Sequence, residues 1–178
     1  MQLPGKDTNI YRDIRGAGAI IHTGGTFSVD PSIGSMSSMP GWAYYFNSEL
    51  VASGTVVIDP GAERWVRLKT LYEELHKLSS SLEIDTCVFE QVPVSAHGGR
   101  SQVGHASLLM ACGVVQAAVA AEYFIGITPI VWKSRTSDDY VKGDEEDAVE
   151  MGRIVCRISQ LMQVEDPKRR YGNRGKSK

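Results

Sequence analysis

The feature of this 178-residue chain that most constrains its fold is a set of apolar segments that end in acids. Asp30 closes an extended run that begins at Thr26, and Glu90 closes a second such run. Asp144 and Asp147 stand three residues apart at the start of a segment with helical periodicity. An acid at the end of a buried strand is unfavourable unless it is paired or binds metal. We therefore expect these three segments to bring four carboxylates together around a divalent cation.

Hydrophobic periodicity divides the chain into five extended and three helical segments. The extended segments are expected at 26–30, 42–46, 50–58, 86–92 and 128–132. The helices are expected at 62–82, 105–123 and 144–162. The apolar positions of the first helix are Trp65, Leu68, Leu71, Tyr72 and Leu75.

This order of elements favours an α/β fold with a mixed five-stranded sheet flanked by helices. Three strands come first and form antiparallel pairs, and the later strands alternate with helices and run parallel. The order resembles the ribonuclease H-like arrangement, in which strands one and four are neighbours. Asp30 and Glu90 would then lie side by side at one end of the sheet.

The closing helix directs its two acids along its apolar stripe. A step of four residues back from Met151 reaches Asp147, and a further step of three reaches Asp144. No Lys or Arg lies near Asp30 or Glu90 in the sequence to neutralise these charges. Oxygen-only ligands suit Mg²⁺, for which Mn²⁺ would substitute, and four carboxylates can hold two ions.

Each acid also has an explanation that needs no metal. Asp144 and Glu145 could be capping and dipole residues in the first turn of a helix. Asp30, which precedes Pro31, could be a turn residue. Glu90 is harder to explain in this way, because its run is typical of a central strand. We predict the metal site because three independent coincidences would otherwise be required.

Charge is distributed unevenly along the chain. The formal net charge is −2, but the segment from Lys168 onward holds six of the 19 Lys and Arg residues and no acid. Such a tail either contacts a polyanion or is a disordered solubilising segment. The hydrophobic fraction of 42% suits one compact domain. We divide the chain into an extension at 1–24, a folded domain at 25–163 and a basic tail at 164–178.

The cysteines and the hydropathy pattern indicate the compartment. Cys87, Cys112 and Cys156 are widely spaced in apolar contexts, which is typical of reduced core residues and not of a disulfide framework or a zinc site. No apolar stretch approaches the ~18–20 residues of a membrane span. The start of the chain does not have the pattern of a secretory signal. We expect a protein of the cytoplasm, of a cell or of a phage host, with no membrane partner.

In their order, these segments resemble the RuvC-type Holliday junction resolvases, especially small phage-type members. The matching segments are Val29-Asp30-Pro31-Ser32, Gly41-Trp42-Ala43, Val88-Phe89-Glu90-Gln91 and Asp144-Glu145-Glu146-Asp147-Ala148. The resemblance spans about 26–162, and it implies that the catalytic and metal-binding residues are Asp30, Glu90, Asp144 and Asp147. It also implies a Mg²⁺-dependent homodimer that nicks two strands of a four-way DNA junction and leaves 5′-phosphate and 3′-hydroxyl ends. The segment 25–163 would be its nuclease domain.

The same resemblance assigns DNA contacts. In such enzymes the loop after the Glu-Gln pair approaches the branch point, and here it supplies His97, Arg100, Ser101 and Gln102. Three residues near the acidic pair either contact phosphates or belong to a solvated loop: Lys133, Arg135 and Lys142. The tail adds Lys168, Arg169 and Arg170. The apolar helix at 105–123 is similar to the family's dimerisation helix.

The chain departs from the family pattern in two places. The segment 32–40 is longer than the usual turn after the Asp-Pro motif. Only 132–142 separates the fifth strand from the acidic pair, where the family commonly has another helix. The second departure removes surface that contacts DNA in the family.

Other functions remain open at this point. A broader nuclease for branched or forked DNA would use the same site. A non-catalytic nucleic-acid-binding module of the same fold would not need four carboxylates, because clustered like charges are destabilising without metal. A sugar-kinase-like or actin-like ATPase should show two Gly-rich phosphate loops, and no convincing second loop is found.

Overall fold

The computed structural model describes residues 25–31, 39–91, 102–136 and 140–164. The proposed extension at 1–24 lies outside these residues, as does almost all of the proposed basic tail. No helix in these four ranges is both long enough and apolar enough to cross a membrane.

A five-stranded mixed sheet forms the centre of the molecule. Its strands are β1 (Gly25–Asp30), β2 (Gly41–Phe46), β3 (Glu49–Thr55), β4 (Thr86–Glu90) and β5 (Tyr123–Ile127), in the spatial order β3-β2-β1-β4-β5. The pairs β1–β2 and β2–β3 are antiparallel, whereas β1–β4 and β4–β5 are parallel. The predicted topology is therefore confirmed, with strands one and four as neighbours.

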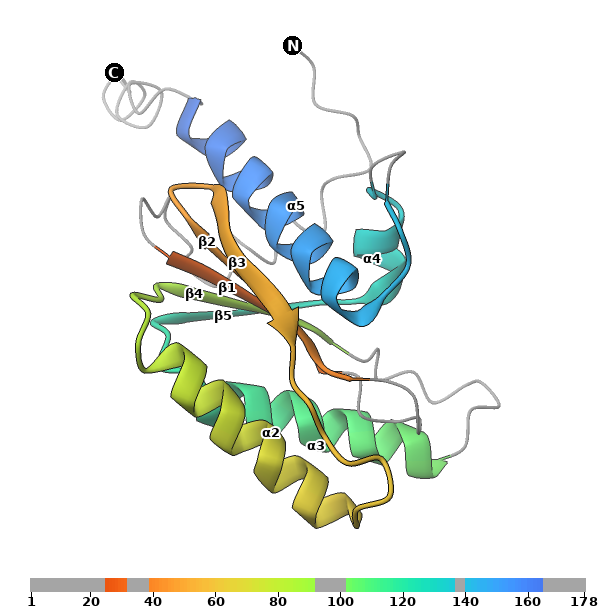
Figure 1. Ribbon diagram of the computed structural model, residues 1–178. Helices are drawn as coiled ribbons and strands as arrows, with labels where there is room; N and C mark the ends of the chain where they lie inside the picture. Colours follow the sequence, from red (N-terminus) through yellow and green to blue (C-terminus); the bar gives the residue numbers. More distant parts are fainter. Residues whose placement is uncertain (1–24, 32–38, 92–101, 137–139, 165–178) are drawn as a thin grey trace, which may run out of the picture.

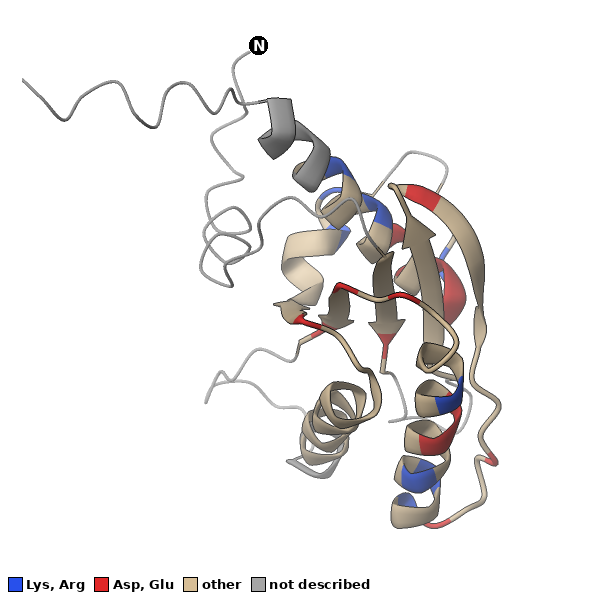
Figure 2. Cartoon of the chain, turned by 90° about the vertical axis from the view of Figure 1, so that its left-hand side faces the viewer, with Lys and Arg blue, Asp and Glu red and all other residues tan. Residues whose placement is uncertain are grey.

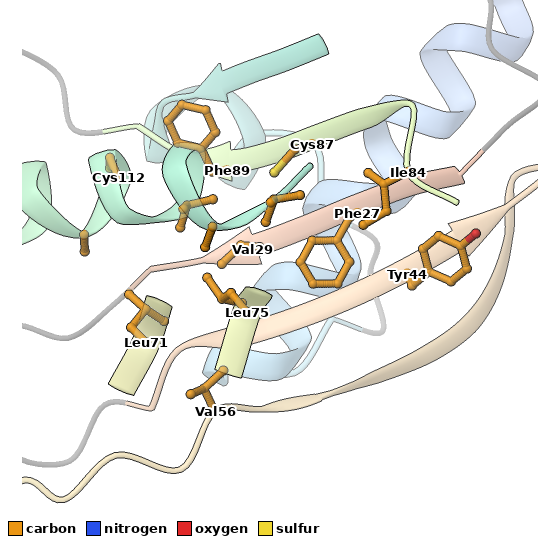
Figure 3. Packing of buried hydrophobic residues seen from close by; sticks show 14 of the residues in the cluster. Phe27, Val29, Tyr44, Val56, Leu71, Leu75, Ile84, Cys87, Phe89 and Cys112 are labelled. Carbon is orange, nitrogen blue, oxygen red and sulfur yellow. The ribbon is translucent and has the colours of Figure 1, made fainter. Parts of the chain in front are cut away.

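Helices cover both faces of this sheet. Figure 1 shows α2 (Arg64–Ser79) and α3 (Gln102–Ala118) on one face, and α4 (Pro129–Lys133) and α5 (Asp144–Val164) on the other. The face towards α2 and α3 buries a large apolar cluster, in which Phe27, Val29 and Cys87 of the strands accompany Leu71 and Leu75 of α2 (Figure 3). The opposite face buries a smaller cluster around Val88, Trp132 and Met151.

A tight turn joins β2 to β3. Asn47 and Ser48 have φ angles of 50° and 67°, the left-handed region that a type I′ hairpin turn requires at both central positions. The predicted hairpin is confirmed, but β3 ends at Thr55 and not at Ile58. Val56 leaves the sheet, and its amide donates to the Pro40 carbonyl at 2.8 Å.

The prediction for the fifth strand was wrong by about five residues. Residues 123–127 form β5, and the predicted strand 128–132 is instead the start of α4. Thr128 occupies the N-cap position and Pro129 follows in the first turn, where its fixed φ suits a helix and its missing N–H costs nothing. The expectation that no helix separates the fifth strand from the acidic pair was therefore also wrong.

Helix boundaries differ from the predictions by a few residues. Helix α3 begins at Gln102 and ends at Ala118, which leaves room for β5 directly after it. Helix α2 buries Leu71 and Leu75, as its periodicity predicted. Trp65 and Tyr72, which were expected in the same apolar stripe, are exposed.

Candidate active site

Asp30 and Glu90 end neighbouring parallel strands on one face of the sheet. Val29 pairs with Phe89 across β1 and β4, so the two acids occupy the next positions along these strands. Because side chains alternate along a strand and Phe89 faces α2 and α3, Glu90 faces α4 and α5. Asp30 and Glu90 are only 2% and 7% exposed. The fold therefore buries both carboxyl groups in the same layer.

Helix α5 packs over this face with its acidic first turn towards the strand ends. Asp147 is buried, and the next residue, Ala148, packs with Ala43 of β2. One turn further along, Gly152 lets the helix approach the sheet closely. A Cβ at Gly152 would lie 2.5 Å from the Tyr45 ring and 3.1 Å from the Ser28 Cβ. This close approach sets the distance between α5 and β1.

The carboxylate of Glu90 accepts a hydrogen bond from an aromatic side chain. The indole Nε1–H of Trp132 donates to its Oε2 at 2.9 Å. Trp132 is completely buried and lies on α4, the helix that sequence reasoning placed in a strand. A buried indole N–H normally needs such a partner. The interaction fixes one oxygen of Glu90.

Asp147 has two partners. The Tyr140 hydroxyl donates to its Oδ1, and the Lys133 Nζ lies 3.6 Å from its Oδ2. Burial raises the pKa of Tyr140, with further contributions from its bond to Asp147 and from the negative charges of Asp147, Asp30 and Glu150. Tyr140 therefore stays a neutral donor at ordinary pH, and it lies within electrostatic range of both predicted acids, Asp30 and Asp147.

Asp144 is less buried than Asp30, Glu90 and Asp147. Its Oδ2 accepts a hydrogen bond at 2.8 Å from the backbone N–H of Met39, which precedes β2. Its own backbone is pressed against Gly41, since a Cβ at Gly41 would lie 1.7 Å from the Asp144 carbonyl oxygen. Asp144 thus fastens the start of α5 to the β1–β2 connection. The prediction that Asp144 belongs to the buried stripe is only partly met, because its side chain is half-buried.

Sequence reasoning missed Glu150, which is as buried as the predicted acids. It is 5% exposed and makes two hydrogen bonds with Arg153, of 2.8 Å from Nε and 2.6 Å from a terminal nitrogen. The spacing from Asp147 places it one turn along α5 and could have identified it. Arg153 neutralises this carboxylate, which marks the pair as a structural ion pair.

The chemistry of the four acids suits the predicted Mg²⁺. The four acids offer carboxylate oxygens only, which is the chemistry that Mg²⁺ and Mn²⁺ prefer. Among the residues that the structure describes, however, no group of three or more His, Cys, Asp or Glu side chains is arranged to hold a metal ion. No Lys or Arg lies near Asp30 or Glu90 in the sequence, but the fold brings Lys133 of α4 beside Asp147.

The predicted DNA-contact residues fall into two groups. Six of them lie outside the described residues: His97, Arg100, Ser101, Lys168, Arg169 and Arg170. The others are described, and of these Gln102 is the first residue of α3. Lys133 and Lys142 are exposed, on the same side of the sheet as the buried acids. Arg135 is half-buried and donates from a terminal nitrogen to the Val131 carbonyl at 2.6 Å.

Comparisons with known proteins agree with this architecture. No model of a protein family matches the sequence, and no curated protein matches it. Among solved structures, the chain is similar to T. thermophilus RuvC in complex with Holliday junction substrate, with a TM-score of 0.58 and 12% identity over 79% of this chain and 96% of that one. The fold is ribonuclease H-like. A second Thermus thermophilus RuvC structure matches with a TM-score of 0.52 and 11% identity, over 78% of this chain and 96% of that one.

Proposed function

We propose that this protein is a Mg²⁺-dependent endonuclease that cuts branched DNA and resolves four-way junctions by paired nicks. The observation that carries the proposal is the burial of Asp30 and Glu90 at the ends of neighbouring parallel strands, with Asp147 of α5 over the same face. The similar RuvC structure contains a Holliday junction substrate, which supports branched DNA as the substrate class.

In this proposal Asp30, Glu90 and Asp147 hold the cations, and Asp144 is the fourth ligand. Divalent cations at such carboxylates neutralise the charge that develops on phosphate oxygens during hydrolysis. The chain's own contribution is to fix the carboxylates. Adjacent strands of one sheet hold Asp30 and Glu90, and the close packing of α5 at Gly152 holds Asp147 above them. The burial of these carboxylates lowers the local dielectric, which strengthens their attraction for a divalent cation.

DNA binding would use cations around this face. Phosphates near the acids would be contacted by Lys133, Lys142 and Arg135. The branch point of the junction would be approached by the loop residues His97, Arg100, Ser101 and Gln102. Lys168, Arg169 and Arg170 of the tail would add sequence-independent affinity. The exposed apolar residues of α3, Leu109 and Met110, support a homodimer in which two sites nick the two strands.

A second candidate is a non-catalytic nucleic-acid-binding module of the same fold. The specific observation in its favour is that acids of the site already have partners within the chain: Trp132 for Glu90, Tyr140 and Lys133 for Asp147, and the Met39 amide for Asp144. Carboxylates that are already hydrogen-bonded can be buried without metal.

The substitution Asp30→Asn tests the proposed nuclease. It keeps the size of the side chain and removes the charge, so cleavage of a four-way junction in Mg²⁺ should fall by roughly 100-fold or more, because several kcal/mol of electrostatic stabilisation are lost. Binding of the junction should be unchanged or tighter. Cleavage and binding are measured in parallel on a four-way junction, a replication fork and linear duplex, which also distinguishes a resolvase from a broader nuclease.

The matched control is Glu83→Gln. Glu83 is an exposed acid that precedes β4, at the end of that strand opposite Glu90. This variant should cut DNA like the wild-type protein. Undiminished cleavage by Asp30→Asn would remove that residue from the catalytic set. Junction binding by the wild-type protein without cleavage in Mg²⁺ or Mn²⁺ would instead favour the non-catalytic module.

A further inference from the structure

An aromatic pair connects the two sides of the candidate active site. Trp132 on α4 donates to Glu90 of β4, and Tyr140 before α5 donates to Asp147. The two rings meet edge to face, with centroids 6.1 Å apart and an interplanar angle of 81°. This aromatic pair, Trp132 and Tyr140, joins an acid of the sheet to an acid of the helix through side chains.

We propose that Trp132 and Tyr140 are positioning residues that hold Glu90 and Asp147 in the orientation that binds divalent cations. The inference rests on the proposed function, because it names the residues that prepare its metal site. Neither aromatic residue would touch the substrate or the metal. Each acts through the carboxylate to which it donates.

The surroundings of Trp132 make its donation to Glu90 directional. The side chain is 0% exposed and packs in the cluster that contains Val88 and Met151, so the indole has no space to turn. Its single N–H therefore points at a fixed place, where it meets the Glu90 Oε2. A carboxylate that is held at one oxygen has lost rotation about its last bond before any ligand arrives.

Tyr140 applies the same constraint to Asp147. Its ring leans against Trp132, and its hydroxyl donates to the Asp147 Oδ1. The other oxygen, Oδ2, faces the Lys133 ammonium at 3.6 Å, and that ammonium also lies 4.7 Å from the centre of the Trp132 ring. A hydrogen bond from Tyr140 and an ion pair with Lys133 thus act on one carboxylate.

Preparation of this kind has a measurable consequence for metal affinity. Donors in the outer shell of a metal site orient its ligands, and their loss typically weakens metal binding by about 10–100-fold. A residue that serves only to fill the core would change stability and leave the affinity of the folded protein for metal unchanged. Metal affinity therefore separates positioning from packing.

The chain supplies matched controls for both bonds. Trp65 donates through its indole N–H to the Glu63 carboxylate, and Tyr123 donates to the Glu122 carboxylate at 2.7 Å. Both pairs are exposed. Trp65 lies on α2, which covers the opposite face of the sheet, and Tyr123 begins β5 at the end of the sheet opposite Glu90. Each reproduces the aromatic-to-carboxylate bond without the candidate site.

The experiment measures Mn²⁺ and Mg²⁺ binding to the full chain by isothermal titration calorimetry, at a temperature where every variant is folded by circular dichroism. The variants are Tyr140→Phe and Trp132→Phe, and the controls are Tyr123→Phe and Trp65→Phe. We expect Tyr140→Phe to weaken metal binding by about 10-fold and Trp132→Phe by at least as much, whereas the controls bind like the wild-type protein. The Mg²⁺ concentration for half-maximal junction cleavage should rise in the same order.

Each outcome decides between the explanations. If the wild-type protein binds metal and Tyr140→Phe binds it equally well or more tightly, the positioning inference is wrong, whether or not stability changes. If Trp132→Phe does not fold, Tyr140→Phe alone decides, because it removes one hydroxyl and leaves the ring. If the wild-type protein itself binds neither ion, the proposed function fails and the inference fails with it. A double variant that loses less affinity than the two single variants combined would confirm that the pair acts as a unit.

Discussion

The two faces of the sheet differ in what they bury. The face under α2 and α3 buries a cluster of aliphatic, aromatic and cysteine side chains (Figure 3). The face under α4 and α5 contains all four acids that are buried among the described residues: Asp30, Glu90, Asp147 and Glu150. Figure 2 shows a further difference within the layer of α2 and α3: α3 carries no Lys, Arg, Asp or Glu, whereas α2 carries residues of both charges.

The two faces of the sheet therefore have different roles: one stabilises the fold, and the other carries the candidate active site. Burial of apolar surface is non-directional and strongly favourable, so the face under α2 and α3 can stabilise the whole domain. Buried acids are unfavourable unless each finds a partner, so the opposite face depends on a few directional hydrogen bonds. A sheet with one face of each kind can keep its fold while the acids remain available for reaction.

The substitution Leu75→Ala should give the largest loss of stability. Leu75 of α2 is completely buried, and its removal leaves a cavity in the apolar cluster. The free energy of unfolding in urea should fall by about 2–5 kcal/mol. Metal affinity of the protein that remains folded should be unchanged, because none of the proposed metal ligands lies on that face. A metal affinity that fell with the stability would show that the two faces are not independent.

Two glycine substitutions sharpen the comparison between the layers. Gly152→Ala on α5 places a methyl group 2.5 Å from the Tyr45 ring and should destabilise the protein by about 1–3 kcal/mol. Gly113→Ala on α3 meets nothing within 4 Å, and it should stabilise the protein by up to about 1 kcal/mol because alanine favours a helix. Thermal unfolding measures both effects, and equal responses of the two helices would argue against the close packing of α5.

Tyr45→Phe should have the smallest effect, and it depends on pH. The Tyr45 hydroxyl donates to the Val149 carbonyl at 2.6 Å, a bond that contributes about 1 kcal/mol at neutral pH. Burial raises the pKa of Tyr45, the charges of Cys156 and Glu150 raise it further, and Arg153 opposes them. The folded pKa thus exceeds the unfolded value of about 10, so the stability that this shift provides is complete below pH 10 and is lost as the pH rises above it.

Urea unfolding between pH 7 and pH 11 measures this dependence. The decline in stability above pH 10 should be shallower in Tyr45→Phe than in the wild-type protein. Tyr72→Phe is the control, since Tyr72 lies exposed on α2. An identical decline in wild-type protein and Tyr45→Phe would mean that this hydroxyl does not report on the packing of α5.

The sequence allowed prediction of the parts of the fold that follow from local periodicity. Two extended apolar runs placed Asp30 and Glu90 at strand ends, and the spacing of three and four residues placed Asp147 on the buried side of α5. The apolar run at 128–132 misled the prediction, because Val and Trp favour strands while Thr128 and Pro129 start a helix.

The partners of the acids could not be predicted in this way. Trp132 meets Glu90 across 42 residues of sequence, and Lys133 lies beside Asp147 only because α4 turns back over the sheet. These contacts depend on tertiary placement, for which no local pattern gives a signal. The same holds for Asp144, whose spacing indicated a metal ligand and whose carboxylate bonds to the Met39 amide. Whether the four acids bind metal stays a prediction.

The contact between Gly41 and the Asp144 backbone has a consequence for protein engineering. No side chain fits at position 41 unless the amino end of α5 moves away from β2. A saturation library at this position, sorted for correctly folded protein, should therefore return almost exclusively glycine codons. Grafted recognition loops that replace the β1–β2 connection should stop before this residue, so that the acidic turn keeps its anchorage.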